Sequence, residues 1–146
     1  MRKPIAVNFH EVGEVADTLL KYAVIVVRCK NKYIFCRHKD RETYEIPGGR
    51  REKGETIDET AKRELWEETG AYRYSLAAVC LYSVVWDDGP SYAKLYFAEG
   101  FEFKPLPEES EIFEISNFEH LPINLTYPAI QPALFEKVLE WLINQN

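Results

Sequence analysis

The N-terminal third of the chain carries two short apolar runs rich in β-branched and aromatic residues, a pattern typical of buried strands. The runs are residues 22–28 and 33–37, and the turn-forming residues 30–32 between them predict an antiparallel hairpin. Residues 44–49 follow as a short extended piece that ends in two glycines. This part of the chain therefore predicts two paired strands and then a glycine turn.

The second half of the chain carries two longer apolar runs, residues 75–86 and 91–101, rich in Val, Tyr and Phe. The segment Asp-Asp-Gly-Pro at 87–90 separates them and predicts another hairpin. An acidic, proline-bearing loop at 105–110 comes next, and residues 112–115 are typical of one more short strand.

Two segments have helical periodicity instead. Residues 56–69 contain neither Gly nor Pro, place Ala61 and Leu65 four positions apart, and are followed by Gly70 as a C-cap. The segment after Pro128 carries apolar residues at i, i+4, i+7 and i+8, which predicts a terminal helix. Hairpins on both sides of one helix, with a second helix at the end, predict an α/β fold with helices covering a mixed sheet.

The length and composition of the chain are typical of one soluble domain. With 146 residues, 46% of them hydrophobic, residues 1–146 are expected to form a single domain with its own core. Residues 1–9 lack the apolar segment of a signal peptide, and no run approaches the ~18 apolar residues of a membrane helix. We therefore expect a cytoplasmic protein without a membrane partner, and the sequence leaves a homodimer open.

The net charge of the chain limits its partners. A formal charge of −6 argues against a broad nucleic-acid surface, which would need clustered Lys and Arg. It does not argue against a small phosphate ligand, because Mg²⁺ can mediate between carboxylates and phosphates. The three cysteines form no CxxC motif, so we expect free thiols, buried in the case of Cys29 and Cys36.

The helix predicted at residues 56–69 has an unusual distribution of carboxylates. At about 100° per residue, Glu68 projects into the apolar stripe of this helix, and Glu64 and Glu67 flank it. Carboxylates at the edge of a core repel one another, and they stay ionised most easily if a cation holds them. Oxygen ligands on one helix face suit Mg²⁺ or Mn²⁺ rather than Zn²⁺, since no Cys or His lies near them in the sequence.

A simpler interpretation is open for the helix alone. Arg63 with Glu67, like Asp58 with Lys62, has the i,i+4 spacing of ordinary surface ion pairs. The preceding turn favours the metal site, because glycines at positions 48 and 49 lack Cβ atoms. Their backbone can adopt positive φ angles and approach a ligand closely.

Residues 49–71 resemble the signature of the Nudix hydrolases at every fixed position. The segment follows the pattern Gly-x5-Glu-x7-Arg-Glu-Leu-x-Glu-Glu-x-Gly-Ala, and chance agreement is on the order of 10⁻⁸ per start position. Only Ala71 departs from the family, which more often has a larger aliphatic residue there. The resemblance implies a Nudix-like α/β/α sandwich around a mixed sheet, and metal-dependent hydrolysis of a phosphoanhydride bond.

The same resemblance implies roles for single residues. The metal, Mg²⁺ or Mn²⁺, would be held by three carboxylates and one backbone carbonyl: Glu64, Glu67, Glu68 and Gly48. Arg63 would anchor this acidic cluster through salt bridges to Glu55 or Glu67. Family members differ over the general base, which is either Glu64 or a carboxylate of a later loop. In this chain Glu111 is the preferred loop residue because it directly precedes an apolar position, although a solvated loop charge is an equal interpretation.

Substrate contacts are less constrained by the sequence. The candidates for phosphate contacts are the basic residues near the signature and the glycine turn: Arg37, Arg50, Arg51 and Gly49. Alternation along a strand lets only one of Arg37 and His38 face the site. Three aromatic residues are candidates for stacking on a base, with sheet packing as the alternative: Tyr44, Trp86 and Tyr92.

We therefore expect a Nudix-type pyrophosphohydrolase that acts on a nucleoside triphosphate or a nucleoside diphosphate-linked small molecule. The alternative is a non-catalytic nucleotide-binding module on the same fold. That module would be expected to have lost metal carboxylates, and none is missing here. An isomerase of isoprenoid diphosphates is disfavoured by the intact signature and by the lack of a convincing catalytic cysteine.

Overall fold

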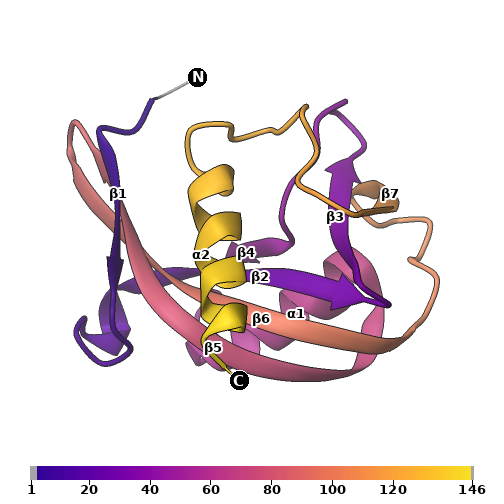
Figure 1. The fold of residues 1–146 in the computed structure, drawn as a ribbon, viewed down its shortest axis with the longest axis horizontal. Coiled ribbons are helices and arrows are strands. Elements are labelled where there is room, and N and C mark those ends of the chain that lie inside the picture. The colour runs from indigo at the N-terminus through magenta and orange to yellow at the C-terminus, as the bar shows by residue number, and fades with distance from the viewer. Residues whose placement is uncertain (1–2, 146) are drawn as a thin grey trace.

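The computed structural model describes residues 3–145, which form one mixed seven-stranded sheet between two α-helices (Figure 1). The strands are β1 (Ala6–His10), β2 (Leu20–Cys29), β3 (Lys32–His38), β4 (Gly48–Arg50), β5 (Ala71–Trp86), β6 (Gly89–Phe103) and β7 (Ile112–Phe118). The helices are α1 (Ile57–Thr69) and α2 (Gln131–Ile143), with a 3-10 turn at Asp17–Leu19. The sheet order is β1-β5-β6-β2-β3-β7, and β4 also pairs with β2.

Both predicted hairpins are confirmed. Strands β2 and β3 pair antiparallel through a tight turn in which Lys30 and Asn31 have φ angles of 53° and 66°. Strands β5 and β6 pair antiparallel along their whole length. The central pair, β2 with β6, is parallel, which makes the sheet mixed as predicted.

The α/β/α arrangement follows from the alternation of side chains along the central strands. On β2, Ala23, Ile25 and Val27 join the core cluster that contains the apolar residues of α1. Val26, between them, joins the other core cluster, which contains Leu134 of α2. Figure 1 accordingly shows α2 in front of the sheet and α1 behind it. The predicted fold class is therefore confirmed.

Helix α1 is fixed at both ends by local interactions. Thr56 and Glu59 form a capping box, in which each side chain accepts a hydrogen bond from the other's backbone N–H. Gly70 ends the helix with a φ angle of 77°, and a Cβ at this position would lie 2.1 Å from the Lys104 carbonyl oxygen. The rotation of α1 buries Glu68, which is 8% exposed, among the apolar residues of the same face.

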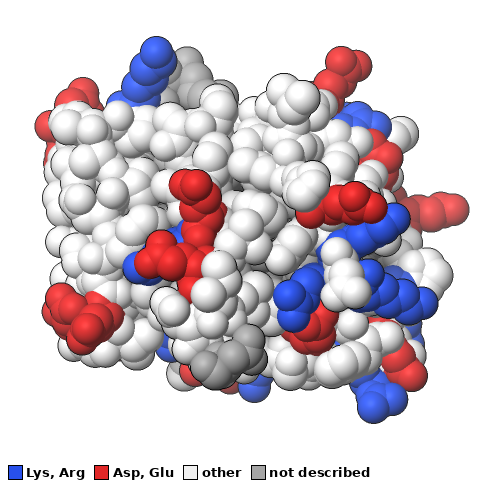
Figure 2. Space-filling model, in the orientation of Figure 1, with Lys and Arg blue, Asp and Glu red and all other residues white. Residues whose placement is uncertain are grey.

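Charged side chains are mixed on the face that carries α2. Figure 2 shows Lys and Arg side chains interspersed with Asp and Glu, mostly on the side where β3 and β7 lie. Within residues 3–145, no helix has the length and apolar character needed to cross a membrane.

Candidate metal and substrate site

The carboxylates of the signature converge where the second half of α1 approaches β4. The Gly48 N–H donates a hydrogen bond to Glu68 Oε1 at 2.8 Å, which ties the buried carboxylate to the strand. The side chain of Glu64 is 13% exposed, whereas that of Glu67 is 46% exposed. The three side chains predicted as metal ligands therefore differ in burial, from Glu68 in the interior to Glu67 at the surface.

The two glycines of β4 are required by close contacts rather than by unusual backbone angles. A Cβ on Gly49 would lie 2.3 Å from Cδ of Glu64, and a Cβ on Gly48 would lie 2.5 Å from the Ala23 carbonyl oxygen. Neither glycine is among the residues with positive φ, so the chain does not use that freedom here. The missing side chain of Gly49 instead lets the strand lie directly against the Glu64 carboxylate, and that of Gly48 lets it lie against β2.

Arg63 lies at the centre of the acidic cluster. Its guanidinium donates to Glu55 Oε2 at 2.6 Å, to Glu64 Oε1 at 2.6 Å and to Glu67 Oε1 at 3.0 Å. A fourth bond, to the Arg50 carbonyl at 2.9 Å, ties the same side chain to β4. The hydrogen bonds from Arg63 are the main reason that the pKa of Glu55 falls to about 2. Arg63 thus contacts both of its predicted partners, Glu55 and Glu67.

The pKa of Glu64 shows that the positive charge of Arg63 does not neutralise the acidic cluster. Burial raises the pKa of Glu64 to about 7, and the nearby Glu68 charge adds to the increase, although Arg63 acts in the opposite direction. A divalent cation would relieve this repulsion. The hard oxygen donors of the cluster have the chemistry that Mg²⁺ and Mn²⁺ prefer, so these residues fit such an ion.

A cavity of about 410 Å³ separates α1 from the loop that precedes β7. All three signature carboxylates line it on the helix side, and Glu109 and Glu111 line it on the loop side. Lys39 fixes this loop, because its N–H donates to the Glu111 carbonyl at 2.9 Å and its Nζ donates to the Glu108 carbonyl at 2.7 Å. The late-loop carboxylates therefore face the helix carboxylates across one cavity.

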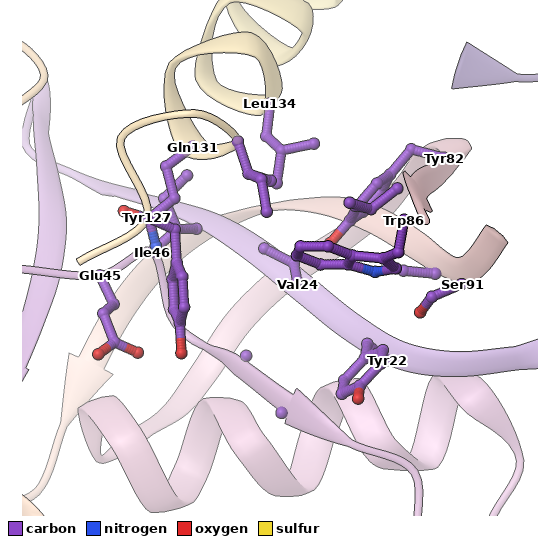
Figure 3. Close-up of a pocket in the computed structure, with 15 residues that line it drawn as sticks. Tyr22, Val24, Glu45, Ile46, Tyr82, Trp86, Ser91, Tyr127, Gln131 and Leu134 are labelled. Atoms are coloured by element: carbon purple, nitrogen blue, oxygen red, sulfur yellow. The ribbon is translucent and has the colours of Figure 1, made fainter. Parts of the chain in front are cut away.

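A second cavity, of about 380 Å³, lies on the other side of Gly48 and Gly49 (Figure 3). In Figure 3, Tyr127 and Trp86 stand on opposite sides of this cavity, and Gln131 enters from α2. Gln131 is 5% exposed. Among the buried side-chain oxygens and nitrogens of residues 3–145, its Oε1 is the one that has no hydrogen-bond partner. The cavity thus combines aromatic walls with an unsatisfied amide.

The basic residues predicted as phosphate contacts lie in different surroundings. Arg37 bonds Glu114 at 2.8 Å and stacks on the Phe113 ring, so its guanidinium is held by β7. The guanidinium of Arg51 bonds the Glu55 carbonyl and Asp17. Arg50 is exposed at the end of β4.

His38, rather than Arg37, faces the candidate site. Its Nε2 lies 3.4 Å from Glu68 Oε2 and 3.5 Å from Glu45 Oε1. The register shift between β3 and β7 at this point skips Phe113 of β7, so β3 keeps its alternation and His38 lies on the opposite face from Arg37. The hydrogen bond with Glu68 raises the pKa of His38.

A thiol that the sequence pattern did not indicate lies beside the carboxylates. Cys36 is completely buried, and its Sγ donates a weak hydrogen bond to Glu68 Oε1 at 3.8 Å. Burial, together with the charges of Glu68 and Glu45, raises the pKa of this thiol well above its ordinary value. The expectation that no Cys or His lies near the carboxylates holds along the sequence and is wrong in space. The expected burial of Cys29 is also incomplete, because that residue is half-buried.

The three aromatic candidates for stacking on a base also lie in different places. Trp86 lines the second cavity, as a stacking residue should. Tyr44 instead bonds Glu114 and packs edge-on against Phe118, and Tyr92 packs near His10. Gln131 was not predicted, and its signal in the sequence is its position at the start of the last helix, shortly after Pro128.

Comparisons with known proteins agree with this geometry. The family model described as the NUDIX domain matches residues 19–141. YtkD of Bacillus subtilis (strain 168), provisionally named an 8-oxo-dGTP diphosphatase, is 34% identical over 109 residues. The match covers 73% of this chain and 66% of that relative's own length.

Two solved structures show the same fold. The crystal structure of a mutant of the Bacillus subtilis pyrophosphohydrolase BsRppH has a TM-score of 0.77 and 26% identity, and covers 92% of this chain and 90% of that one. The NUDIX domain of Shewanella oneidensis NrtR, crystallised with ADP ribose, has a TM-score of 0.65 and 17% identity. It covers 84% of this chain and 88% of that one, and at this identity it is evidence for the fold alone.

Proposed function

Because the chain belongs to the Nudix family, we propose that it is a Nudix-type enzyme that hydrolyses a phosphoanhydride bond in a nucleotide. The substrate is a nucleoside triphosphate or a nucleoside diphosphate linked to another group. The observation that carries the proposal is the convergence of Glu64, Glu67 and Glu68 between two cavities, with Arg63 bonded to two of them.

The metal ligands in this proposal are Glu64, Glu67 and Glu68, with the Gly48 carbonyl as a backbone ligand. When bound, Mg²⁺ or Mn²⁺ supplies neutralisation of phosphate charge and polarisation of the P–O bond that breaks. Arg63 holds the Glu64 and Glu67 carboxylates in position through its hydrogen bonds to both. Glu55 supports Arg63 in turn, since it accepts two of the guanidinium bonds.

The general base removes a proton from the attacking water, and two carboxylates are candidates. Glu111 lines the cavity opposite the signature carboxylates and is exposed, so it is free to accept a proton. Glu64 bonds Arg63 and serves as a metal ligand in the proposal, which consumes part of its basicity. This difference favours Glu111 as the general base. The water would attack phosphorus in line with the leaving phosphate or nucleotide.

The nucleoside occupies the second cavity in our proposal. Trp86 and Tyr127 offer flat aromatic surfaces to a base, and Gln131 offers an amide that can read a base edge with one donor and one acceptor. The phosphates then pass Gly49, whose missing side chain leaves room beside the Glu64 carboxylate. Arg50, exposed at the end of the same strand, is the basic residue nearest to this path along the chain.

A panel of nucleotides tests the function. The purified protein is incubated with Mg²⁺ and with ordinary and 8-oxo nucleoside triphosphates, ADP-ribose and a dinucleoside polyphosphate. Phosphate, pyrophosphate, nucleotides and ribose phosphate are then separated. We expect Mg²⁺-dependent release of one of these products from at least one nucleotide. The absence of turnover for the whole panel, with nucleotide binding retained, would support the alternative of a non-catalytic binding module instead.

A further inference from the structure

A second group of side chains that could hold a metal ion lies beside the carboxylates of α1. Cys36 and His38 are two positions apart on β3, so their side chains share a face, and α1 brings Glu68 over that face. One ligand atom from each of the three residues lies within 4.8 Å of the other two. The group therefore combines sulfur, nitrogen and oxygen donors, unlike the purely oxygen-based set of Glu64 and Glu67.

Two distances from the Glu68 carboxylate are close to the spacing of ligands in a tetrahedral metal site. Zinc binds sulfur at about 2.3 Å, and nitrogen or oxygen at about 2.0–2.2 Å. Tetrahedral angles then place sulfur roughly 3.6 Å from oxygen, and nitrogen roughly 3.4 Å from oxygen. In this chain Cys36 Sγ lies 3.8 Å from Glu68 Oε1, and His38 Nε2 lies 3.4 Å from the other oxygen, Oε2. A small rotation of this carboxylate would bring one oxygen to such a distance from both donors.

We infer that Cys36, His38 and Glu68 form a binding site for a thiophilic divalent cation such as Zn²⁺. Glu45 is placed to complete the site, because its Oε1 lies 3.5 Å from the same nitrogen of His38. Sulfur and imidazole ligands favour zinc strongly over magnesium, which prefers oxygen. Binding forms a metal–thiolate bond and releases the thiol proton to solvent, with no change in oxidation state.

The site has a consequence for activity, which rests on the proposed function. Glu68 serves as a ligand both in the magnesium site of that proposal and in the zinc site, so the two metals compete for one carboxylate. Zn²⁺ is therefore an inhibitor of the Mg²⁺-dependent reaction, and a zinc-selective chelator that leaves Mg²⁺ in solution restores activity. The binding of zinc itself does not depend on the protein being an enzyme.

Cobalt is the probe for the thiolate ligand, because Co²⁺ replaces Zn²⁺ and absorbs light. We expect Co²⁺ to produce a thiolate-to-cobalt charge-transfer band that Zn²⁺ abolishes. Cys36→Ser should remove the band, whereas Cys80→Ser, which alters another buried thiol, should retain it. A band that survives in Cys36→Ser, or no band in the wild-type protein, would overturn the site.

A second variant keeps the test independent of folding defects at Cys36. His38→Gln should weaken Zn²⁺ binding, measured by calorimetry, by more than about 100-fold, because even groups that only support a ligand contribute about 10–100-fold. His10→Gln, a histidine paired with Ser83 elsewhere, is the matched control and should bind normally. Equal zinc affinity in both variants would contradict the proposal. Failure of the nucleotide panel would leave these binding measurements unaffected.

Discussion

At the scale of single residues, the two glycines of β4 differ in what a side chain would strike. A methyl group on Gly48 would meet backbone atoms of β2, which cannot move without disturbing the sheet. The three atoms nearest to a methyl group on Gly49 would all belong to the Glu64 carboxylate, the end of a flexible side chain. Position 48 therefore constrains the fold, and position 49 constrains the site.

This difference predicts opposite outcomes for two alanine variants. Gly48→Ala should lower the free energy of unfolding by about 1–3 kcal/mol, the usual cost of overpacking. Gly49→Ala should leave stability nearly unchanged and reduce kcat/KM and metal affinity, because Glu64 must leave its place. Denaturant unfolding and steady-state kinetics measure the two effects. Full activity in a stable Gly49→Ala protein would show that the position of Glu64 is unimportant.

Glu68 offers a second test at this scale. Glu68→Gln retains an oxygen that can accept the Gly48 N–H, so the protein should fold, with slightly higher stability because Glu64 loses a repelling neighbour. Turnover should fall by at least about 10²-fold, the cost of removing one group that stabilises transition-state charge. Thermal unfolding and kcat decide the matter. A variant that unfolds, with its residual folded fraction fully active, would make Glu68 a structural residue.

The site residues that the sequence predicted lie on one element, whereas those that it did not predict come from several elements. Glu64, Glu67, Glu68 and Arg63 share one helix, so their relative directions follow from a single period. Cys36 meets that helix only through the packing of β3 against it, and the choice between Arg37 and His38, left open by alternation, depends on the same packing. Gln131 comes from another helix entirely. Contacts of this kind have no period along the chain, so the sequence does not show which of these side chains meet.

At the scale of elements, strong patterns predicted the long strands and both helices. Strand β4 was not predicted, because Gly-Gly-Arg has low strand propensity. It can pair with β2 because its glycines permit the close approach. Strand β1 was also missed, because its five residues carry no fully buried side chain to set a clear alternation. Both elements depend on the sheet that they join.

The loop between β6 and β7 carries the prediction that belongs to this scale. If Glu111 takes the proton, Glu111→Gln should lower kcat by about 10²–10⁴-fold while metal affinity stays normal. Glu109→Gln, from the same loop and the same cavity, is the matched control and should have a small effect. If Glu64 is the base, its Gln variant should lose both metal affinity and rate. Wild-type turnover in Glu111→Gln across Mg²⁺ concentrations would exclude that residue from the reaction.

At the scale of the whole molecule, the Nudix resemblance and the α/β/α fold are confirmed. Both could be predicted because one local signature and two hairpins leave few arrangements of a mixed sheet. A single domain over residues 1–146, a cytoplasmic location and a homodimer stay predictions, as do the identity of the metal and the roles of individual residues. These properties depend on partners and surfaces that no period in the chain encodes.

The metal site makes one prediction for the stability of the whole fold. Mg²⁺ or Mn²⁺ binds only where α1, β4 and the carboxylates are assembled, so it should raise the midpoint of thermal unfolding. At a concentration of 100 times Kd, the stabilisation is about 2.7 kcal/mol. Glu64→Gln/Glu67→Gln should largely lose this shift. Glu136→Gln/Glu140→Gln removes the same charge from α2 and is the matched control, which should keep it. Equal shifts in both double variants would mean that the ion acts by general screening, and that the carboxylates of α1 hold no metal.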